Sequence, residues 1–214
     1  MLKVYGRSTS DNVQKVLWML GETGQPFEHI QLGGSFGGLD DPDYLALNPH
    51  GRVPTLEDSG TVVWESSAII RYLAAQYCPG SLWPESPAAR ASADQWMSWE
   101  QSTLYRDFNG LFWLSVRTPT DQQDQDKIQS RNDRLSDHYR LLDAHLSKNR
   151  FVAGDHLTMG DVPIGMTLFR YFNMPIRRPE LPNVEALYQR LCERDAYQRA
   201  VMVSFDELRG RLAY

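Results

Sequence analysis

The order of strand-like and helix-like segments in the first 80 residues limits the fold most strongly. A short apolar run comes first, and Val13, Val16 and Leu20 then recur at helical spacing. The expected segments, in order, are a strand over Leu2–Tyr5, a helix that Gly24 ends, strands over 27–32, 54–57 and Thr61–Trp64, and a helix over Ser66–Tyr77. Residues 58–60 supply a hairpin turn. A βαβ unit followed by a ββα unit predicts a small mixed sheet covered by helices.

The stretch "CPGSLWPESP", residues 78–87, marks a change of pattern. Its three prolines and one glycine are typical of a connection between domains. After it, helical patterns follow over residues 88–116, 124–148, 162–171, 184–194 and 196–205. We therefore predict an N-terminal α/β domain over residues 1–78, a linker over 79–87 and an all-helical domain over 88–214.

The composition narrows the possible functions. The 214 residues carry a net charge of -5 and no cluster of Lys and Arg, so we expect neither nucleic acid nor a membrane surface as partner. Cys78 and Cys192 lie too far apart in the sequence to form a CxxC pair or a metal cluster, so no metal is expected. The absence of a signal pattern and of a long apolar run predicts a cytoplasmic protein.

Residues 48–73, "NPHGRVPTLEDSGTVVWESSAIIRYL", contain several short motifs in a fixed order. This stretch resembles the glutathione-binding motif of the soluble glutathione transferases. The segment "YGRSTSDNVQKVLWML" is similar to the N-terminus of serine-type members, namely the bacterial and plant phi or theta-like ones. The resemblance covers the whole chain. It implies a thioredoxin-like N-terminal domain with an all-α C-terminal domain, glutathione as co-substrate without a metal, a role in detoxification, and a homodimer.

The resemblance also assigns a glutathione site. Pro54 would be cis and would expose the backbone of Val53, to which the tripeptide adds as an extra strand. Glu65 would face the ammonium of the γ-glutamyl group. Ser66 would donate to its carboxylate, at a helix start where free N–H groups favour an anion. In the alternative interpretation, Ser66 only caps the helix and Glu65 only complements its dipole.

The glycine carboxylate of glutathione needs a cation at the other end of the site. Arg52 lies next to Val53, and His50 lies two residues earlier, so either could reach that carboxylate. In the alternative interpretation, both side chains simply face solvent.

The stretch "RSTSDN", residues 7–12, offers hydroxyls for the thiol. The thiolate is the nucleophilic form, and a hydroxyl that donates to sulfur lowers the pKa of the thiol. The resemblance puts Ser10 at the catalytic serine, with Asn12 where some relatives place an amide beside the sulfur. Thr9 is the next candidate and Ser8 follows it. Tyr5 lies near the position of the donor in tyrosine-type classes.

A structural role competes for the same segment. Ser10 or Asp11 could cap the helix that follows, and Asp11 with Gln14 has the spacing of a capping box. We expect both roles together, with Asp11 capping the helix and Ser10 facing the sulfur.

Aromatic side chains on the long helix could form a pocket for an apolar electrophile: Tyr105, Phe108, Phe112 and Trp113. At helical spacing such residues equally form a core. Arg117 could attract an anionic substrate or simply complement the end of the helix. In "GDHLTMGDVPIG", which resembles the family's folding motif, Thr158 and Asp161 predict a structural capping box.

These patterns together predict transfer of the glutathione sulfur to a small electrophile such as an alkyl halide or a haloacid. One alternative keeps glutathione but changes the reaction to peroxide reduction, disulfide reduction or isomerisation. Another is a non-catalytic binding module with the same fold.

Overall fold

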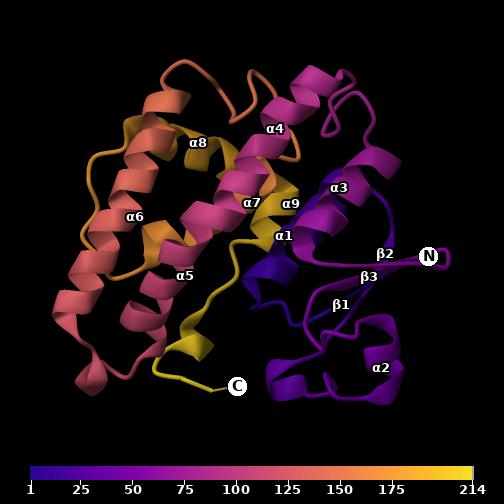
Figure 1. Cartoon of the computed structure of the whole chain (residues 1–214), viewed down its shortest axis with the longest axis horizontal. Helices are drawn as coiled ribbons and strands as arrows, with labels where there is room; N and C mark the ends of the chain where they lie inside the picture. Colours follow the sequence, from indigo (N-terminus) through magenta and orange to yellow (C-terminus); the bar gives the residue numbers. More distant parts are fainter. Residues whose placement is uncertain (214) are drawn as a thin grey trace.

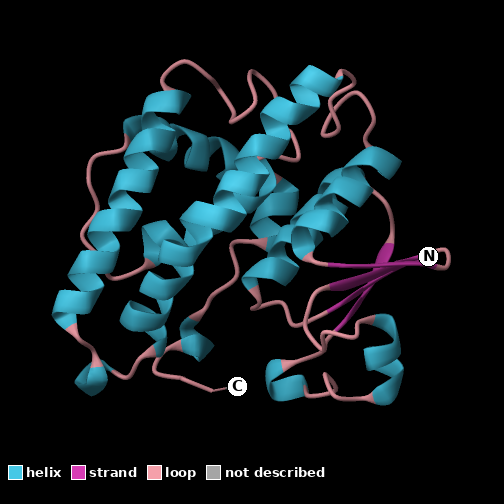
Figure 2. Cartoon of the chain, in the orientation of Figure 1, coloured by secondary structure: helices cyan, strands magenta, loops and turns pink. Residues whose placement is uncertain are grey.

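The computed structural model describes residues 1–213, and its N-terminal part is built on one four-stranded sheet. The strands are β1 (Leu2–Tyr5), β2 (Phe27–Ile30), β3 (Thr55–Asp58) and β4 (Thr61–Trp64). Their order in the sheet is β2-β1-β3-β4, with β1 parallel to β2 and antiparallel to β3. Figure 2 shows these strands gathered at one end of the molecule, with the rest helical or loop. The predicted mixed sheet is confirmed.

The hairpin turn differs in detail from its prediction. Asp58 pairs with Thr61, so only Ser59 and Gly60 form the turn. Both have positive φ, 49° and 91°, as a two-residue type I′ turn requires. The strand ends shift accordingly, because Asp58 belongs to β3.

Three helices cover the sheet. They are α1 (Asp11–Thr23), α2 (Pro42–Leu47) and α3 (Ser66–Tyr77). Figure 1 shows α2 on one side of the sheet and α1 with α3 on the other, toward the remaining helices. Helix α1 ends as predicted, at Gly24 with φ 68°.

The C-terminal part is helical, as predicted, but its long helix is not uniform. Helices α4 (Pro87–Trp99) and α5 (Tyr105–Phe112) are joined by the π-helical segment Glu100–Leu104, and a second π-helical segment, Trp113–Arg117, follows α5. The remaining helices are α6 (Gln125–Leu146), α7 (Asp161–Asn173), α8 (Pro182–Cys192) and α9 (Asp195–Ala200). The last helix ends before the predicted residue 205.

The two parts share a core at helix α1. Trp18 of α1 packs edge-on against Tyr197 of α9, with ring centroids 4.8 Å apart. Gly165 of α7 lies so close that an added Cβ would come within 2.7 Å of the Trp18 ring. Helix α1 is therefore held by the sheet on one side and by α7 and α9 on the other.

The capping box predicted for Thr158 and Asp161 forms only in part, because Gly160 holds the capping position of α7. Asp161 nevertheless stabilises the start of this helix. Its buried carboxylate accepts the backbone N–H of Thr158 and that of Val152, both at 2.8 Å. Among residues 1–213, no helix combines the length and apolar character needed to span a membrane.

Candidate active site

A cavity of about 160 Å³ lies where three segments of the N-terminal domain meet. The segments are the start of α1, the loop before β3, and the junction of β4 with α3. The residues that line the cavity are Asn12, Asn48, His50, Arg52, Val53, Pro54, Trp64, Glu65 and Ser66. All six residues of the predicted glutathione-binding set, together with His50, thus lie in one place.

The loop before β3 is held by one side chain of α2 and one of its own. The Arg52 carbonyl accepts the Tyr44 hydroxyl at 2.6 Å and the Asn48 side-chain amide at 2.8 Å. The Val53–Pro54 peptide bond is cis, as the resemblance implied. Among the described residues, neither the N–H nor the C=O of Val53 has a hydrogen-bond partner. The backbone of Val53 is therefore available to a ligand.

The start of α3 settles the alternative role of Ser66. The capping position is occupied by Glu65, whose φ of 70° is unusual for a residue with a side chain. Ser66 is the first helical residue, so its hydroxyl does not cap the helix. It donates instead to the Asn12 side-chain oxygen at 3.2 Å. The N–H groups of the first turn remain available, and the interpretation of Ser66 as only a cap is wrong.

Ser10, rather than Asp11, holds the capping position of α1. The Ser10 carbonyl accepts the first helical bond from Gln14 at 2.9 Å, and its hydroxyl makes no capping bond. The side-chain amide of Gln14 donates to the Ser8 carbonyl at 2.9 Å. The predicted capping box of Asp11 and Gln14 is therefore wrong, because the helix is capped one residue earlier. Ser10 is only 8% exposed.

The other candidate residues differ in the hydrogen bonds that they make. The Tyr5 hydroxyl donates to Glu57, and burial together with this bond raises the pKa of Tyr5 to about 12. The Tyr5 hydroxyl is thus already used in a hydrogen bond within the sheet. Thr9 is half-buried, and its carbonyl accepts Arg170 of α7 at 2.7 Å. Among the described residues, the side-chain hydroxyls of Ser8, Thr9 and Ser10 have no hydrogen-bond partner, so all three stay candidates for the sulfur donor. None of the three belongs to the residues that line the cavity, which Asn12 borders.

The predicted electrophile-pocket residues lie apart from the cavity. Phe108 and Phe112 are buried in the helical core. Tyr105 donates its hydroxyl to Asp11 at 2.8 Å, and burial raises the pKa of Tyr105 well above its usual value. Arg117 is buried, and its Nε donates to the Arg211 carbonyl at 2.8 Å. The structure therefore favours the core interpretation for both phenylalanines.

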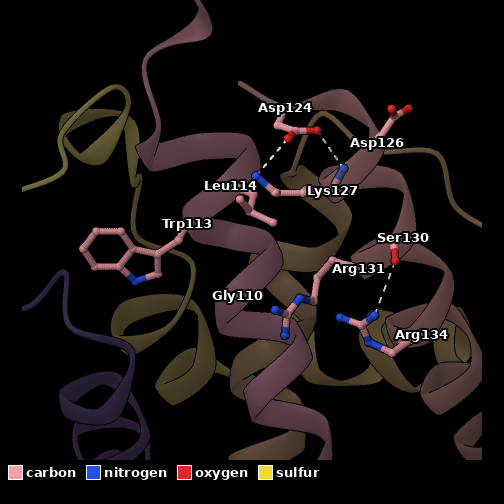
Figure 3. Close-up of a pocket in the computed structure, with 9 residues that line it drawn as sticks. All are labelled: Gly110, Trp113, Leu114, Asp124, Asp126, Lys127, Ser130, Arg131 and Arg134. Atoms are coloured by element: carbon pink, nitrogen blue, oxygen red, sulfur yellow. Dashed lines mark hydrogen bonds and ion pairs between the residues drawn. The ribbon is translucent and has the colours of Figure 1, made fainter. Parts of the chain in front are cut away.

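A larger cavity, about 630 Å³, lies between α5 and α6 (Figure 3). The basic side chains that line it are paired within the domain: Lys127 with Asp124 at 3.0 Å, and both Arg131 and Arg134 with Asp107, at 2.9 and 3.2 Å. Figure 3 shows Trp113 extending away from these side chains. None of the residues that line it comes from the N-terminal domain. Its size alone does not make it the candidate site.

Comparisons with known proteins identify the family of the chain. Residues 4–81 match the family described as "Glutathione S-transferase, N-terminal domain", and residues 106–195 match the corresponding C-terminal domain. Glutathione S-transferase GstB of Escherichia coli (strain K12) is 42% identical over 205 residues, which cover 95% of this chain and 99% of that protein. The chain belongs to the glutathione S-transferase family.

Other members of the family extend the comparison. Glutathione S-transferase 3 of Zea mays is 31% identical over 206 residues, which cover 94% of this chain and 93% of that protein. The crystal structure of the theta class glutathione S-transferase from Xanthomonas axonopodis pv. citri, with glutathione bound, superposes with a TM-score of 0.91. It is 46% identical and covers 95% of this chain and 98% of that one. The likeness thus includes a solved family member that holds glutathione.

Sequence analysis did not single out several residues that line the cavity or hold the segments around it. Asn48 opens the quoted motif and Trp64 precedes Glu65, so their position in the motif was the available signal. Tyr44 and Arg170 carry no such signal, because their contacts depend on the packing of distant segments.

Proposed function

We propose that the chain binds glutathione in the cavity at Asn12 and transfers its sulfur to a small electrophile such as an alkyl halide or a haloacid. The observation that supports this most is the convergence of the six predicted residues on one cavity. The glutathione backbone would pair with Val53, and the γ-glutamyl carboxylate would lie at the start of α3, near Ser66. Arg52 and His50 border the same cavity, where a carboxylate from the glycine end could be bound.

The proposed chemistry needs a thiolate, and Ser10 is the proposed donor. A hydroxyl that donates to sulfur and a nearby helix start both favour the charged form of the thiol. Lowering the pKa of the thiol by about two units corresponds to about 2.7 kcal/mol. The sulfur then attacks the carbon that bears the halide. The C–S bond forms as the C–halogen bond breaks, the halide leaves, and the thiol proton goes to solvent.

Binding of glutathione is the first test of this proposal. Glutathione should stabilise the protein against heating, in proportion to its concentration over Kd. Cysteinylglycine, which lacks the γ-glutamyl group, should stabilise it much less if the start of α3 binds that group. If millimolar glutathione gave no stabilisation, the non-catalytic module would become the better interpretation.

Turnover on three substrates then separates the possible reactions. We expect the chloride or bromide of a haloacid to be released faster than a hydroperoxide or a glutathione disulfide is reduced. No cysteine lies in the segment of residues 7–12, which favours conjugation over exchange through an enzyme thiol. Faster turnover of the hydroperoxide or the disulfide would reverse this choice.

We also propose that the chain forms a homodimer. Large apolar side chains are exposed on β4 and on α6, namely Trp64 (41%) and Leu141 (53%). In the arrangement that the resemblance implies, the N-terminal domain of one subunit packs on the helical domain of the other, which would cover exposed side chains on both. Light scattering should give twice the chain mass of 24.6 kDa. The mass of a single chain would contradict the proposal.

A further inference from the structure

Arg170 of α7 is a buried arginine that reaches the segment carrying Ser10. Its side chain is only 4% exposed, and its Nη2 donates to the Thr9 carbonyl at 2.7 Å. The same nitrogen lies 3.4 Å from the Gln14 side-chain oxygen. Gln14 in turn holds the Ser8 carbonyl. The two carbonyls that precede Ser10 are therefore both fixed, one of them directly by the helical domain.

Asp11, on the other side of Ser10, is fixed by the same domain. Its Oδ2 accepts the Tyr105 hydroxyl at 2.8 Å and lies 4.0 Å from the Arg170 Nη1. Ser10 thus stands between two residues that contact Arg170. The Ser10 hydroxyl makes no capping bond, and both residues next to Ser10 are held by contacts with the helical domain.

The charge of Asp11 matters for a thiolate nearby. A carboxylate one residue from Ser10 would disfavour a second negative charge. Burial by itself raises the pKa of Asp11, but the charges of Arg170 and Lys15 and the bond from Tyr105 hold it below its ordinary value. Asp11 is therefore ionised at neutral pH. The guanidinium of Arg170 is the main cation that compensates its negative charge.

Other charged groups face the same region. Lys15 of α1 forms an ion pair with Glu100 of the π-helical segment, at 3.0 Å, and both side chains are buried. Arg7 lies in the loop itself, and its carbonyl accepts the Ser10 N–H at 3.1 Å. Because Lys15 is shared between Asp11 and Glu100, removal of Arg170 would leave Asp11 with only part of its counter-charge.

We propose that Arg170 is a positioning residue for Ser10: it fixes the Thr9 carbonyl on one side and neutralises Asp11 on the other. It does not contact the sulfur itself. This inference rests on the proposed function, in which the Ser10 hydroxyl donates to the thiol of glutathione. A lysine at this position would keep the charge but lose the planar fork that spans Thr9 and Asp11.

The test measures the ultraviolet absorbance of the thiolate of bound glutathione as the pH is varied. It compares two variants, one that removes a positive charge and one that removes a negative charge. Arg170→Gln should move the midpoint upward by about one pH unit, because Asp11 then opposes the thiolate. Asp11→Asn should move it downward, because Arg170 then remains uncompensated. The double variant should return close to the wild-type midpoint.

Arg194→Gln is the matched control. Arg194 also joins the helical domain to α1, through Glu22 at 2.7 and 2.5 Å, but at the far end of that helix. Its loss should loosen the domain contact without moving the midpoint. A looser contact between the domains cannot by itself move the titration midpoints of Arg170→Gln and Asp11→Asn in opposite directions.

The outcomes distinguish a failure of the positioning role of Arg170 from a failure of the proposed function. A folded Arg170→Gln variant with an unshifted midpoint, or a shift shared with Arg194→Gln, overturns the positioning role. If Arg170→Gln fails to fold, Asp11→Asn decides: a downward shift supports the role, and no shift or an upward shift overturns it. If the wild-type protein binds no glutathione, both the proposed function and this inference are wrong. If glutathione binds normally but the titration midpoints of the variants do not move, only this inference is wrong.

Discussion

The Ser66 hydroxyl donates to the side-chain oxygen of Asn12 across 3.2 Å, which joins the start of α3 to the start of α1. Both residues line the cavity proposed for glutathione. Asn12 thus lies beside the Glu65–Ser66 junction, at the end of the cavity proposed for the γ-glutamyl group. The resemblance had suggested a position beside the sulfur. The two helix starts form one wall of the site.

Replacing Ser66 by alanine should mainly weaken glutathione binding. The lost bond to a carboxylate predicts a rise of about tenfold in KM for glutathione, with a smaller change in kcat. Steady-state kinetics with varied glutathione measures both constants. Ser67→Ala is the matched control, since Ser67 is buried in the same turn but does not line the cavity. Equal KM values for Ser66→Ala and wild type would contradict the assignment.

The parts of the site that were predicted from sequence are local motifs. Val53 with Pro54, and Glu65 with Ser66, sit at fixed spacings in one stretch of 26 residues, so their arrangement follows from nearby chain. The capping residue of α1 was misassigned because Ser10 and Asp11 are both good capping residues and are adjacent. Propensity alone does not separate such neighbours.

Contacts between distant segments were beyond sequence reasoning. Arg170 meets the Thr9 carbonyl although 161 residues separate them, and no periodicity of either segment indicates the pairing. Phe108 and Phe112 show the same limit. Apolar residues at helical spacing fit a core and a pocket equally well, and only the packing of α5 shows that both are buried.

The buried ion pair between Lys15 and Glu100 should be needed for stability. Its Nζ and Oε1 atoms are 3.0 Å apart. Lys15→Met would leave Glu100 without its counter-charge, so the free energy of unfolding should fall by about 3 kcal/mol. Chemical denaturation measures the loss. Lys15→Met with Glu100→Gln should recover much of it, and the exposed Lys148→Met is the control. A Lys15→Met variant as stable as Lys148→Met would refute this prediction.

Asp107 should give the stability a dependence on acidic pH. It accepts Arg131 at 2.9 Å, Arg134 at 3.2 Å and His138 at 3.1 Å. Burial raises the pKa of Asp107, but these three bonds outweigh burial and hold it below the ordinary value. A carboxyl with a lowered folded-state pKa stabilises the protein above its unfolded-state pKa, and this contribution is lost as the pH falls.

The corresponding test uses Asp107→Asn at several pH values. At pH 7 the variant should be less stable by about 1–2 kcal/mol, and the difference should shrink as the pH falls below about 4. Asp133→Asn is the control, because Asp133 is exposed and accepts only Gln129. A difference that stays constant down to pH 3 would show that the charge of Asp107 is not the cause.

The most direct test of the central claim is the thiolate titration of glutathione bound to wild type and to Ser10→Ala. The wild-type midpoint should lie about two pH units below that of the free thiol, and it should return toward the free value in Ser10→Ala. Thr9→Ala distinguishes the other candidate, since a rise in that variant alone would assign the donor to Thr9. An unchanged midpoint in Ser10→Ala would contradict the claim that Ser10 stabilises the thiolate.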